Sequence, residues 1–455
     1  MRRILIIGAG KSTSSLIRFL NEKSSQEDIE ITVADKDESQ AKRITKGFEN
    51  IKQLSLDIFN SEERENAIKS ADIVVSMLPA RFHINVAKDC VKFNKNMVTA
   101  SYVSDEMEAL DDEVKSNGLT FMNEIGVDPG IDHMSAMQVL DRIKNKGGKM
   151  LMFESFTGGL VAPESDDNLW HYKFTWNPRN VVVAGQGSAA KFIQENKYKY
   201  IPYQRLFRRT EFLRVPQYGM FEGIANRDSL KYREIYGLEG IPTLYRGTLR
   251  RVGFAKAWNI FVQLGLTDDT YIMDNTKDMS YREFINSFLP YSPTDSVELK
   301  LRHNLKIDQD DLLWEKLLEL DLFNPKKKIG LEKATPAQAL QKILEDKWTL
   351  EPEDKDMIVM YHKFGYELDG EKHQIDSTMV SIGENQTYTA MAKTVGLPVG
   401  MATLKILNGE ISRKGVLRPI YPDVYNPILK DLEAYDIKFK EQEVEYLGYN
   451  IENVR

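Results

Sequence analysis

The first twenty residues constrain the fold more than any other part of the chain. Residues 2–7 form a short apolar run, residues 8–10 read Gly-Ala-Gly, and apolar side chains then recur at helical spacing from residue 16 to residue 20. A strand, a glycine turn and a helix in this order begin a dinucleotide-binding unit, because the glycines let the backbone approach a pyrophosphate and the helix N-terminus favours its negative charge. We therefore expect Gly8 and Gly10 to contact a dinucleotide cofactor.

The glycine turn departs from the ideal GxGxxG pattern and leaves alternatives open. Thr13 stands where the third glycine is expected. Gly10-Lys11-Ser12 also matches the end of a nucleoside-triphosphatase phosphate loop, but that pattern needs a glycine at the position of Leu5. We set that interpretation aside on the pattern, and a turn that binds nothing remains the simpler alternative.

Further apolar runs predict the other strands of one sheet. Helical patterns separate them, at residues 61–69 and 83–93 among others. Strands that alternate with helices predict an α/β fold with a Rossmann-type, doubly wound parallel sheet. The expected strands after the first are residues 29–34, 54–58, 71–79, 97–100 and 119–122.

The second strand ends in Asp35-Lys36-Asp37, which bears on the choice of cofactor. An acidic residue at this point bonds the adenosine ribose hydroxyls and repels a 2′-phosphate, so Asp35 favours NAD. Lys36 favours NADP if its ammonium meets that phosphate instead. Asp57 follows the third expected strand, near the expected adenine. We expect NAD or NADP, with NAD favoured.

Composition excludes several classes of protein. The chain has 455 residues, of which 42% are apolar and 28% charged, with a net charge of −7 and one cysteine, Cys90. No uninterrupted apolar run reaches the ~18 residues of a membrane span, and the mild charge argues against a nucleic-acid partner. A single cysteine fits a reducing compartment, so we expect a soluble, cytoplasmic protein. The histidines have no metal-ligand spacing, so we expect no metal.

The pattern changes after Gly147-Gly148. Short strands separated by Gly, Pro, Asn and Asp predict a second, mixed α+β substrate domain, interrupted by a charged helical insert. The expected strands are residues 150–156, 172–176, 181–184, 212–215, 244–252, 357–368 and 374–381, followed by helices at 387–395 and 398–408. The expected domains are residues 1–127 for the dinucleotide, 128–266 and 351–386 for the substrate, and 267–350 for the insert.

Residues 123–133 concentrate more chemistry than any other stretch: Asn-Glu-Ile-Gly-Val-Asp-Pro-Gly-Ile-Asp-His. Asp128-Pro129-Gly130 predicts a tight turn after the last expected strand of the sheet. Ligands of open α/β sheets bind outside the carboxyl ends of the strands, so we expect Asp128 to face the substrate and to be the catalytic residue. His133 begins the next helix, either as a helix-terminus or core residue or as a proton shuttle.

Arginines in the second domain are candidate carboxylate ligands. Arg227 lies in Asn-Arg-Asp-Ser, and Arg246 and Arg250 lie in Arg-Gly-Thr-Leu-Arg-Arg. A guanidinium binds a carboxylate through two parallel hydrogen bonds. Each arginine taken alone is more often a solvated or intramolecular partner.

Short motifs occur in order along nearly the whole chain: Ser101-Tyr102-Val103-Ser104, residues 123–134, Ala162-Pro163-Glu164, Tyr172-Lys173-Phe174-Thr175-Trp176, Asn226-Arg227-Asp228-Ser229, residues 246–250, residues 388–393 and Lys414-Gly415-Val416-Leu417. Together they resemble the motifs of the saccharopine reductase family. This is the glutamate-forming saccharopine dehydrogenase, a free enzyme in fungi and the C-terminal half of the bifunctional aminoadipic semialdehyde synthase in animals. The resemblance also accounts for Thr13 in the glycine turn.

The resemblance implies an oxidoreductase that oxidises the secondary amine of saccharopine to an imine with NAD or NADP. Hydrolysis of the imine gives glutamate and 2-aminoadipate 6-semialdehyde. It also implies that residues 387–430 return to the dinucleotide domain, and we expect a homodimer. The implied cofactor contacts are Lys11, Ser12, Thr13, Ser14, Asp35, Lys36, Asp37, Asp57, Ile58, Met77, Val127, Asp128, Pro129 and Trp176. The implied substrate contacts are Ser101, Tyr102, Asp128, Arg227, Thr248, Leu249 and Arg250.

Three departures from the family pattern bear on the substrate. Thr157 stands where the family has a cysteine, Val161 replaces a proline, and residues 168–171 differ from the usual Asn-Pro-Leu-Gly. An amine oxidoreductase similar to carboxynorspermidine synthase or lysine 6-dehydrogenase is therefore an alternative, as is a non-enzymatic scaffold. Lys173, His133 and Tyr102 are lesser candidates for moving the proton.

Overall fold

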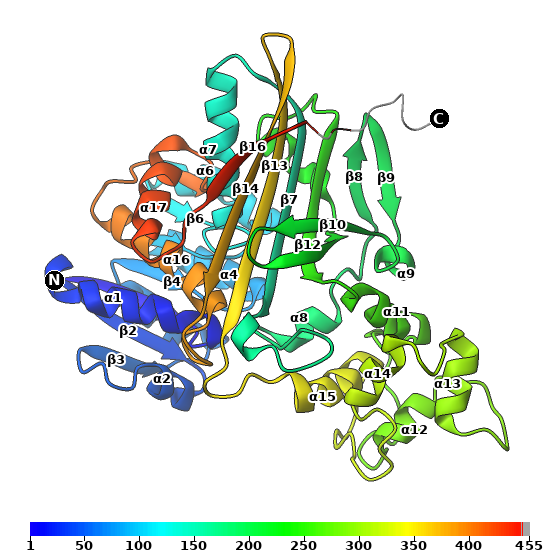
Figure 1. Cartoon of the computed structure of the whole chain (residues 1–455). Coiled ribbons are helices and arrows are strands. Elements are labelled where there is room, and N and C mark those ends of the chain that lie inside the picture. Colours follow the sequence, from blue (N-terminus) through cyan, green and yellow to red (C-terminus); the bar gives the residue numbers. More distant parts are fainter. Residues whose placement is uncertain (447, 449–455) are drawn as a thin grey trace. The chain divides into compact units, whose positions relative to one another are not determined.

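The computed structural model describes residues 1–446 and 448. The chain forms two compact units (Figure 1). Unit 1 contains Met1–Met150 and Tyr366–Glu445, and unit 2 consists mainly of Leu151–Gly365. The domains expected from the sequence divide the chain differently at residues 128–150 and 366–386, which here belong to unit 1.

Unit 1 is built on a parallel sheet of seven strands in the order β15-β6-β5-β4-β1-β2-β3. The order reverses between β1 and β4, which places a ligand crevice at the carboxyl ends of these strands. The Rossmann-type, doubly wound sheet expected from the sequence is confirmed. Its strands are β1 (Arg2–Ile7), β2 (Ile29–Asp35), β3 (Ile51–Ser55), β4 (Ile73–Ser76), β5 (Asn96–Val98), β6 (Thr120–Met122) and β15 (Gly415–Leu417).

Two strands of this sheet differ from the expectation. The third strand is residues 51–55 rather than 54–58, because β3 pairs with β2 from Ile51 to Ser55, and Asp57 therefore lies in the following loop. The seventh strand, β15, comes from the C-terminal part of the chain and pairs with β6. With only three residues, β15 is too short to show the alternation of apolar and polar residues that identifies a strand in a sequence.

Helices cover both faces of the parallel sheet. Leu5 and Ile7 of β1 face a core shared with residues of α3 and α4. On the opposite face α16 packs along α1 so closely that a Cβ at Gly396 would lie 2.6 Å from the Leu16 amide nitrogen. The helices of unit 1 are α1 (Ser14–Glu27), α2 (Glu38–Ile44), α3 (Ser61–Ser70), α4 (His83–Lys92), α5 (Asp105–Glu108), α6 (Asp111–Ser116), α7 (Ile131–Asn145), α16 (Ala390–Leu407) and α17 (Pro422–Glu433).

The expectation of two helices at 387–395 and 398–408 is wrong, because α16 is one helix with Pro398 inside it. An internal proline costs about 3 kcal/mol, which close burial against α1 outweighs. By length and composition α16 would pass as a membrane span, yet 72% of it is buried within the fold. It is the core helix of unit 1.

Unit 1 also contains β14 (Glu371–Ile382), which pairs antiparallel with β16 (Lys440–Val444). Unit 2 contains a mixed sheet in which β10, β11, β12, β7 and β13 follow in this order, with β8 paired to β12 and to β9. Strands β12 and β7 are parallel, whereas β10, β11 and β12 are antiparallel. The strands are β7 (Lys149–Val161), β8 (Ala190–Gln194), β9 (Lys197–Ile201), β10 (Thr210–Val215), β11 (Gly219–Ala225), β12 (Thr243–Arg251) and β13 (Asp356–Leu368).

Two expected strands of unit 2 are wrong. Residues 181–184 lie in and just after α8 (Pro178–Val182), because Asn177 caps the helix and Pro178 occupies its first turn. Residues 172–176 make only an isolated bridge between Phe174 and Thr349. Their apolar side chains pack instead against Trp348 in an aromatic core.

The remaining helices of unit 2 are mostly short. They include those of the expected insert and α11, which contributes Phe254, Trp258 and Phe261 to the aromatic core. Their bounds are α9 (Tyr203–Leu206), α10 (Tyr232–Ile235), α11 (Phe254–Leu264), α12 (Tyr281–Asn286), α13 (Val297–Leu305), α14 (Leu312–Glu319) and α15 (Pro336–Trp348).

Candidate active site

The glycine turn after β1 forms a cradle with no room for a side chain at its base. Gly8 has φ of 107°, and a Cβ there would lie 2.7 Å from the carbonyl oxygen of Met77 at the end of β4. A Cβ at Gly10 would meet nothing within 4 Å, so the turn is open on that side. The backbone amides before α1 can therefore be approached by a pyrophosphate, and these residues fit a dinucleotide.

Thr13 holds the turn where the usual pattern has a glycine. Its hydroxyl donates to the Gly10 carbonyl oxygen at 2.5 Å, and its side chain is buried. Ser14 is also buried, and it donates to the carbonyl oxygen of Thr387 at 2.6 Å. Lys11 is exposed and Ser12 is half-buried, so these two side chains remain accessible beside the cradle.

The end of β2 is tied to the glycine turn. The Asp35 carboxylate accepts the Ala9 N–H at 2.7 Å through Oδ2 and the Asp37 N–H at 2.9 Å through Oδ1. Asp37 accepts the Ser39 N–H at 3.0 Å and so caps α2. Because both oxygens of Asp35 already accept backbone donors, its capacity for ribose hydroxyls is reduced.

Lys36 and Asp57 lie together, with Nζ 2.9 Å from Oδ2. The pKa of Asp57 is lowered because its carboxylate accepts the Phe59 N–H and faces the Lys36 ammonium. Lys36 itself is largely exposed. The neighbouring Ile58 packs into the core beneath the sheet, so its side chain is not a surface for ligands, whereas Met77 is half-buried.

A buried histidine joins the ends of two central strands. His83 begins α4, and its Nδ1 lies 2.8 Å from Ser76 Oγ while its Nε2 lies 2.7 Å from Ser101 Oγ. Burial lowers the pKa of His83 to about 4, so the imidazole is neutral at pH 7. The sequence predicted that a helix begins at His83. It did not predict that the His83 imidazole contacts Ser101, a candidate substrate residue.

In the loop after β6 the backbone folds back on itself so closely that a side chain would not fit at Gly130. A Cβ at Gly130 would lie 2.1 Å from the carbonyl oxygen of Gly126, and the peptide between Asp128 and Pro129 is cis. Val127 is buried in this loop, whereas the Asp128 side chain is half-exposed. The Tyr102 hydroxyl donates to Asp128 Oδ1 at 3.2 Å, so two candidate site residues meet here.

Beneath this loop lies a buried charge network centred on Glu124. Glu124 is 3% exposed and has φ of 54°; it lies 2.8 Å from His133 Nε2 and accepts the Val103 N–H and Arg418 Nε–H, each at 3.0 Å. Burial alone would raise the pKa of Glu124, but His133, Val103 and Arg418 lower it overall. His133 therefore supports the loop from inside the core. Glu124 lies in the stretch 123–133 that the sequence singled out, but nothing in the sequence pattern pointed to its partner Arg418.

In unit 2, Thr248 and Arg250 lie on one face of β12, because side chains two residues apart in a strand share a face. The Arg250 guanidinium lies over the rings of Tyr172 and Phe254 and donates to the Leu249 carbonyl oxygen. It is 8% exposed, and no carboxylate of the described residues pairs with it. A buried guanidinium without a counter-ion is costly, which a ligand carboxylate would remedy.

Two buried hydroxyls without a hydrogen-bond partner belong to residues next to Arg250 or Thr248. Tyr172, whose ring lies beneath Arg250, has no partner for its hydroxyl in the described structure. The same holds for Thr157, which sits beside Thr248 in the pairing of β7 with β12. Buried hydroxyls of native proteins nearly always have partners, so this part of unit 2 is suited to a polar ligand.

Three other sequence candidates of unit 2 have different surroundings. Arg227 is exposed at the end of β11 with φ of 38°, and Trp176 is half-buried before α8. The Leu249 side chain is fully buried on the face of β12 opposite to Arg250, so it can contribute only its backbone.

Lys173 is a poor candidate for moving a proton. Its ammonium pairs with Asp354 at 2.7 Å and with Asp167 at 2.9 Å. Burial alone would lower the pKa of Lys173, but these two carboxylates raise it above the usual value. Among the described residues, no cluster of three or more His, Cys, Asp or Glu side chains is arranged to hold a metal ion.

A glycine cradle at the switch point of a Rossmann sheet, with a carboxylate loop beside it, defines a dinucleotide-dependent oxidoreductase. Comparison with known proteins gives the particular family. Residues 4–122 match the model of the saccharopine dehydrogenase NADP binding domain, and residues 126–437 match that of the saccharopine dehydrogenase C-terminal domain. The chain belongs to the saccharopine dehydrogenase family.

Individual relatives agree with this assignment. The chain is 33% identical to the Saccharomyces cerevisiae saccharopine dehydrogenase [NADP(+), L-glutamate-forming] over 97% of this chain and 99% of the relative. It is 35% identical to mouse mitochondrial alpha-aminoadipic semialdehyde synthase, of which it spans 48%. The apo structure of the S. cerevisiae enzyme matches with a TM-score of 0.86, covering 98% of this chain and 100% of that one. A Legionella pneumophila homospermidine synthase, 10% identical with a TM-score of 0.55, shares the fold alone.

Proposed function

We propose that the protein oxidises saccharopine with NAD(P) to L-glutamate and 2-aminoadipate 6-semialdehyde. The cofactor, when bound, would supply the acceptor for a hydride from the CH2 carbon next to the secondary amine, which is the carbon that becomes the aldehyde. The nitrogen loses its proton, the C–N bond becomes an imine, and water then cleaves the imine. The same residues serve the reverse, reductive direction.

The observation that carries the proposal is the buried Arg250 without a carboxylate partner, on a strand whose neighbours include unpartnered hydroxyls. Saccharopine has three carboxylates and would supply the missing counter-ion. Thr248 on the same face adds a donor, and Arg227 adds an exposed guanidinium. A substrate without a carboxylate, such as a polyamine, would leave Arg250 unpaired.

Asp128 is the residue we assign to the reacting amine. Its half-exposed carboxylate on a tightly fixed loop can accept a hydrogen bond from the substrate nitrogen or from the attacking water. The Tyr102 hydroxyl, at 3.2 Å, fixes one carboxylate oxygen. Ser101 binds a substrate carboxylate, and the neutral His83 holds its hydroxyl in place.

For the cofactor we propose NADP rather than NAD, against the preference expected from the sequence. The S. cerevisiae relative and the matching N-terminal family model are both named for NADP. Both oxygens of Asp35 already accept backbone N–H groups, and the exposed Lys36 ammonium stands beside them in sequence as a phosphate partner. Lys36→Ala should raise KM for NADP about tenfold and leave KM for NAD unchanged. Equal effects on both cofactors would contradict this choice.

Titration calorimetry of saccharopine against the cofactor-loaded protein tests the function directly. The wild type should bind saccharopine in preference to lysine, spermidine and glutamate, and Arg250→Met should lose that preference. Preferred binding of a polyamine would favour the alternative amine oxidoreductase.

We also propose a homodimer and a reducing, cytoplasmic setting. The single thiol, Cys90, is fully buried, and burial raises its pKa, so the chain has no exposed cysteine that could form a disulfide. Light scattering on the purified protein tests the dimer, and microscopy of a tagged chain tests the compartment.

A further inference from the structure

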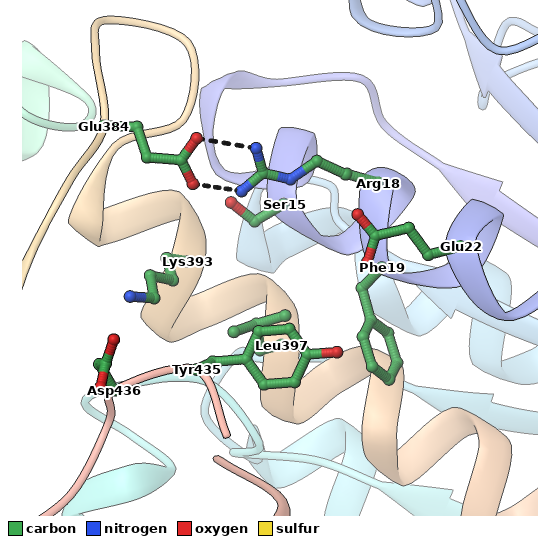
Figure 2. Close-up of a pocket in the computed structure, with 9 residues that line it drawn as sticks. All are labelled: Ser15, Arg18, Phe19, Glu22, Glu384, Lys393, Leu397, Tyr435 and Asp436. Atoms are coloured by element: carbon green, nitrogen blue, oxygen red, sulfur yellow. Dashed lines mark hydrogen bonds and ion pairs between the residues drawn. The ribbon is translucent and has the colours of Figure 1, made fainter. Parts of the chain in front are cut away.

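A second cavity of unit 1 lies between α1 and α16, on the flank of α1 (Figure 2). Its volume is about 290 Å³, which is enough for a small organic molecule. Residues of the two helices, of the loop after β14 and of the turn after α17 form its walls. None of these side chains has a role in the proposed reaction.

One wall of the cavity is fixed by an ion pair. Both terminal nitrogens of the Arg18 guanidinium bind the Glu384 carboxylate, with Nη1 at 2.9 Å from Oε2. The guanidinium also lies over the Tyr388 ring, 3.9 Å from its centre. Arg18 and Glu384 therefore neutralise each other, and Figure 2 shows the pair joining α1 to the loop after β14.

The other charged side chains of the cavity form no direct ion pair among the described residues. Lys393 of α16, Glu22 of α1 and Asp436 after α17 line it, and none of the three forms an ion pair or side-chain hydrogen bond with another described residue. Burial lowers the pKa of Lys393, although Asp436 and Glu384 act in the opposite direction. One ammonium and two carboxylates are thus presented to the same space.

A buried hydroxyl adds a second, independent observation. Ser15 lines the cavity, is 2% exposed, and its Oγ has no hydrogen-bond partner in the described structure. Phe19, Leu397 and Tyr435 supply the apolar part of the wall, with the Phe19 and Tyr435 rings in edge contact at 5.9 Å. Unpartnered buried hydroxyls are rare in native proteins and mark a place where a polar partner is missing.

We propose that this cavity binds a small amino acid with a cationic side chain. The ligand carboxylate would face Lys393 and Ser15, its two ammonium groups would face Glu22 and Asp436, and its methylene groups would lie on the apolar wall. This class follows from the charges, since a ligand with one negative and two positive groups complements the unpaired ammonium and the two carboxylates. The site lies outside the catalytic machinery and does not depend on the proposed reaction.

Titration calorimetry with L-ornithine as the probe tests the site on the full-length protein carrying Arg250→Met, which disables the substrate pocket. L-ornithine should bind, and L-glutamate and acetate should bind at least about tenfold more weakly. Lys393→Met should weaken L-ornithine binding by tenfold or more, whereas Lys88→Met, which removes an exposed ammonium of α4, should not.

Asp436→Asn gives a second test that does not disturb folding, because asparagine tolerates the left-handed backbone of residue 436. It should weaken L-ornithine more than acetate. The proposal is overturned if L-ornithine does not bind, if L-glutamate binds more tightly, or if Lys393→Met binds as well as Lys88→Met. Saccharopine turnover by Lys393→Met in the otherwise wild-type protein should stay unchanged, so failure here is distinct from failure of the proposed function.

Discussion

His83 Nε2 lies 2.7 Å from the Oγ of Ser101 at the carboxyl ends of β4 and β5. The other ring nitrogen lies 2.8 Å from Ser76 Oγ, so the imidazole joins two hydroxyls. A neutral imidazole has one donor and one acceptor nitrogen, so one of the two hydroxyls donates to the ring and the other accepts from it. Through this contact a buried histidine sets the orientation of a residue that we assign to the substrate.

His83→Leu should raise KM for saccharopine about tenfold with a smaller effect on kcat, because Ser101 loses its fixed orientation while the reacting amine is untouched. His83→Gln places an amide near the position of Nε2 and should recover part of the loss. Steady-state kinetics of both variants provide the measurement. A KM that is equal in the two variants would show that His83 only fills space.

His83 should also make stability depend on pH. Its pKa is about 4 in the folded protein and 6.5 when unfolded, so between these values the unfolded chain binds more protons. Neutral His83 adds up to about 3 kcal/mol to the free energy of unfolding. This stabilisation is complete above pH 6.5 and is lost as the pH falls towards 4. Urea unfolding of the wild type and of His83→Gln at several pH values measures it. Parallel curves for the two proteins would contradict the shift.

Arg250→Met should weaken saccharopine binding tenfold to a hundredfold, which is the contribution of a charge-assisted hydrogen bond. Without ligand, the variant should be at least as stable as the wild type. This opposite pair of effects follows because the guanidinium is buried without a carboxylate among the described residues. Calorimetry gives the affinity, and thermal unfolding gives the stability. Arg214→Lys on the exposed side of β10 is the control and should change neither. Destabilisation by Arg250→Met would mean that Arg250 is a structural residue.

Glu124→Gln should destabilise the protein by about 3–5 kcal/mol, because it leaves the Arg418 and His133 side chains without their shared carboxylate in the core. Glu108→Gln removes the exposed partner of Arg418 and should cost no more than about 1 kcal/mol. Chemical unfolding of the two variants compares the same arginine with a buried and an exposed partner. If both substitutions lowered the free energy of unfolding by the same amount, Glu124 would not be the centre of the buried charge network.

Where local pattern and tertiary environment agree, the sequence predicted the structure. The last four residues of β1 are all buried, so a continuous apolar run identified this strand, whereas the alternation of apolar and polar residues at the start of β2 matches its alternating burial. The segment 181–184 misled because its β-branched residues suggested a strand, whereas the cap at Asn177 made a helix. The strand β15 and the Glu124–Arg418 contact join residues about three hundred positions apart, and such pairings have no local signal.

The candidate site was predictable in the same measure. Gly8 and Asp128 could be named as candidates because glycine turns and Asp-Pro-Gly turns have a signature in the sequence. The unpaired state of Arg250 and the bridging position of His83 depend on which side chains surround them, and one sequence does not contain that information. The choice between NAD and NADP depends in the same way on surroundings that the sequence does not show, because the Asp35 carboxylate accepts the amides of Ala9 and Asp37.

The proposed function is tested most directly by the initial rate of saccharopine-dependent NADP+ reduction by the purified protein, with the products identified by mass spectrometry. We expect reduction with L-glutamate and 2-aminoadipate 6-semialdehyde released in equal amounts, and a loss of at least about a hundredfold in kcat/KM for Asp128→Asn. Absence of saccharopine-dependent reduction with both NADP+ and NAD+, or release of lysine in place of glutamate, would contradict it.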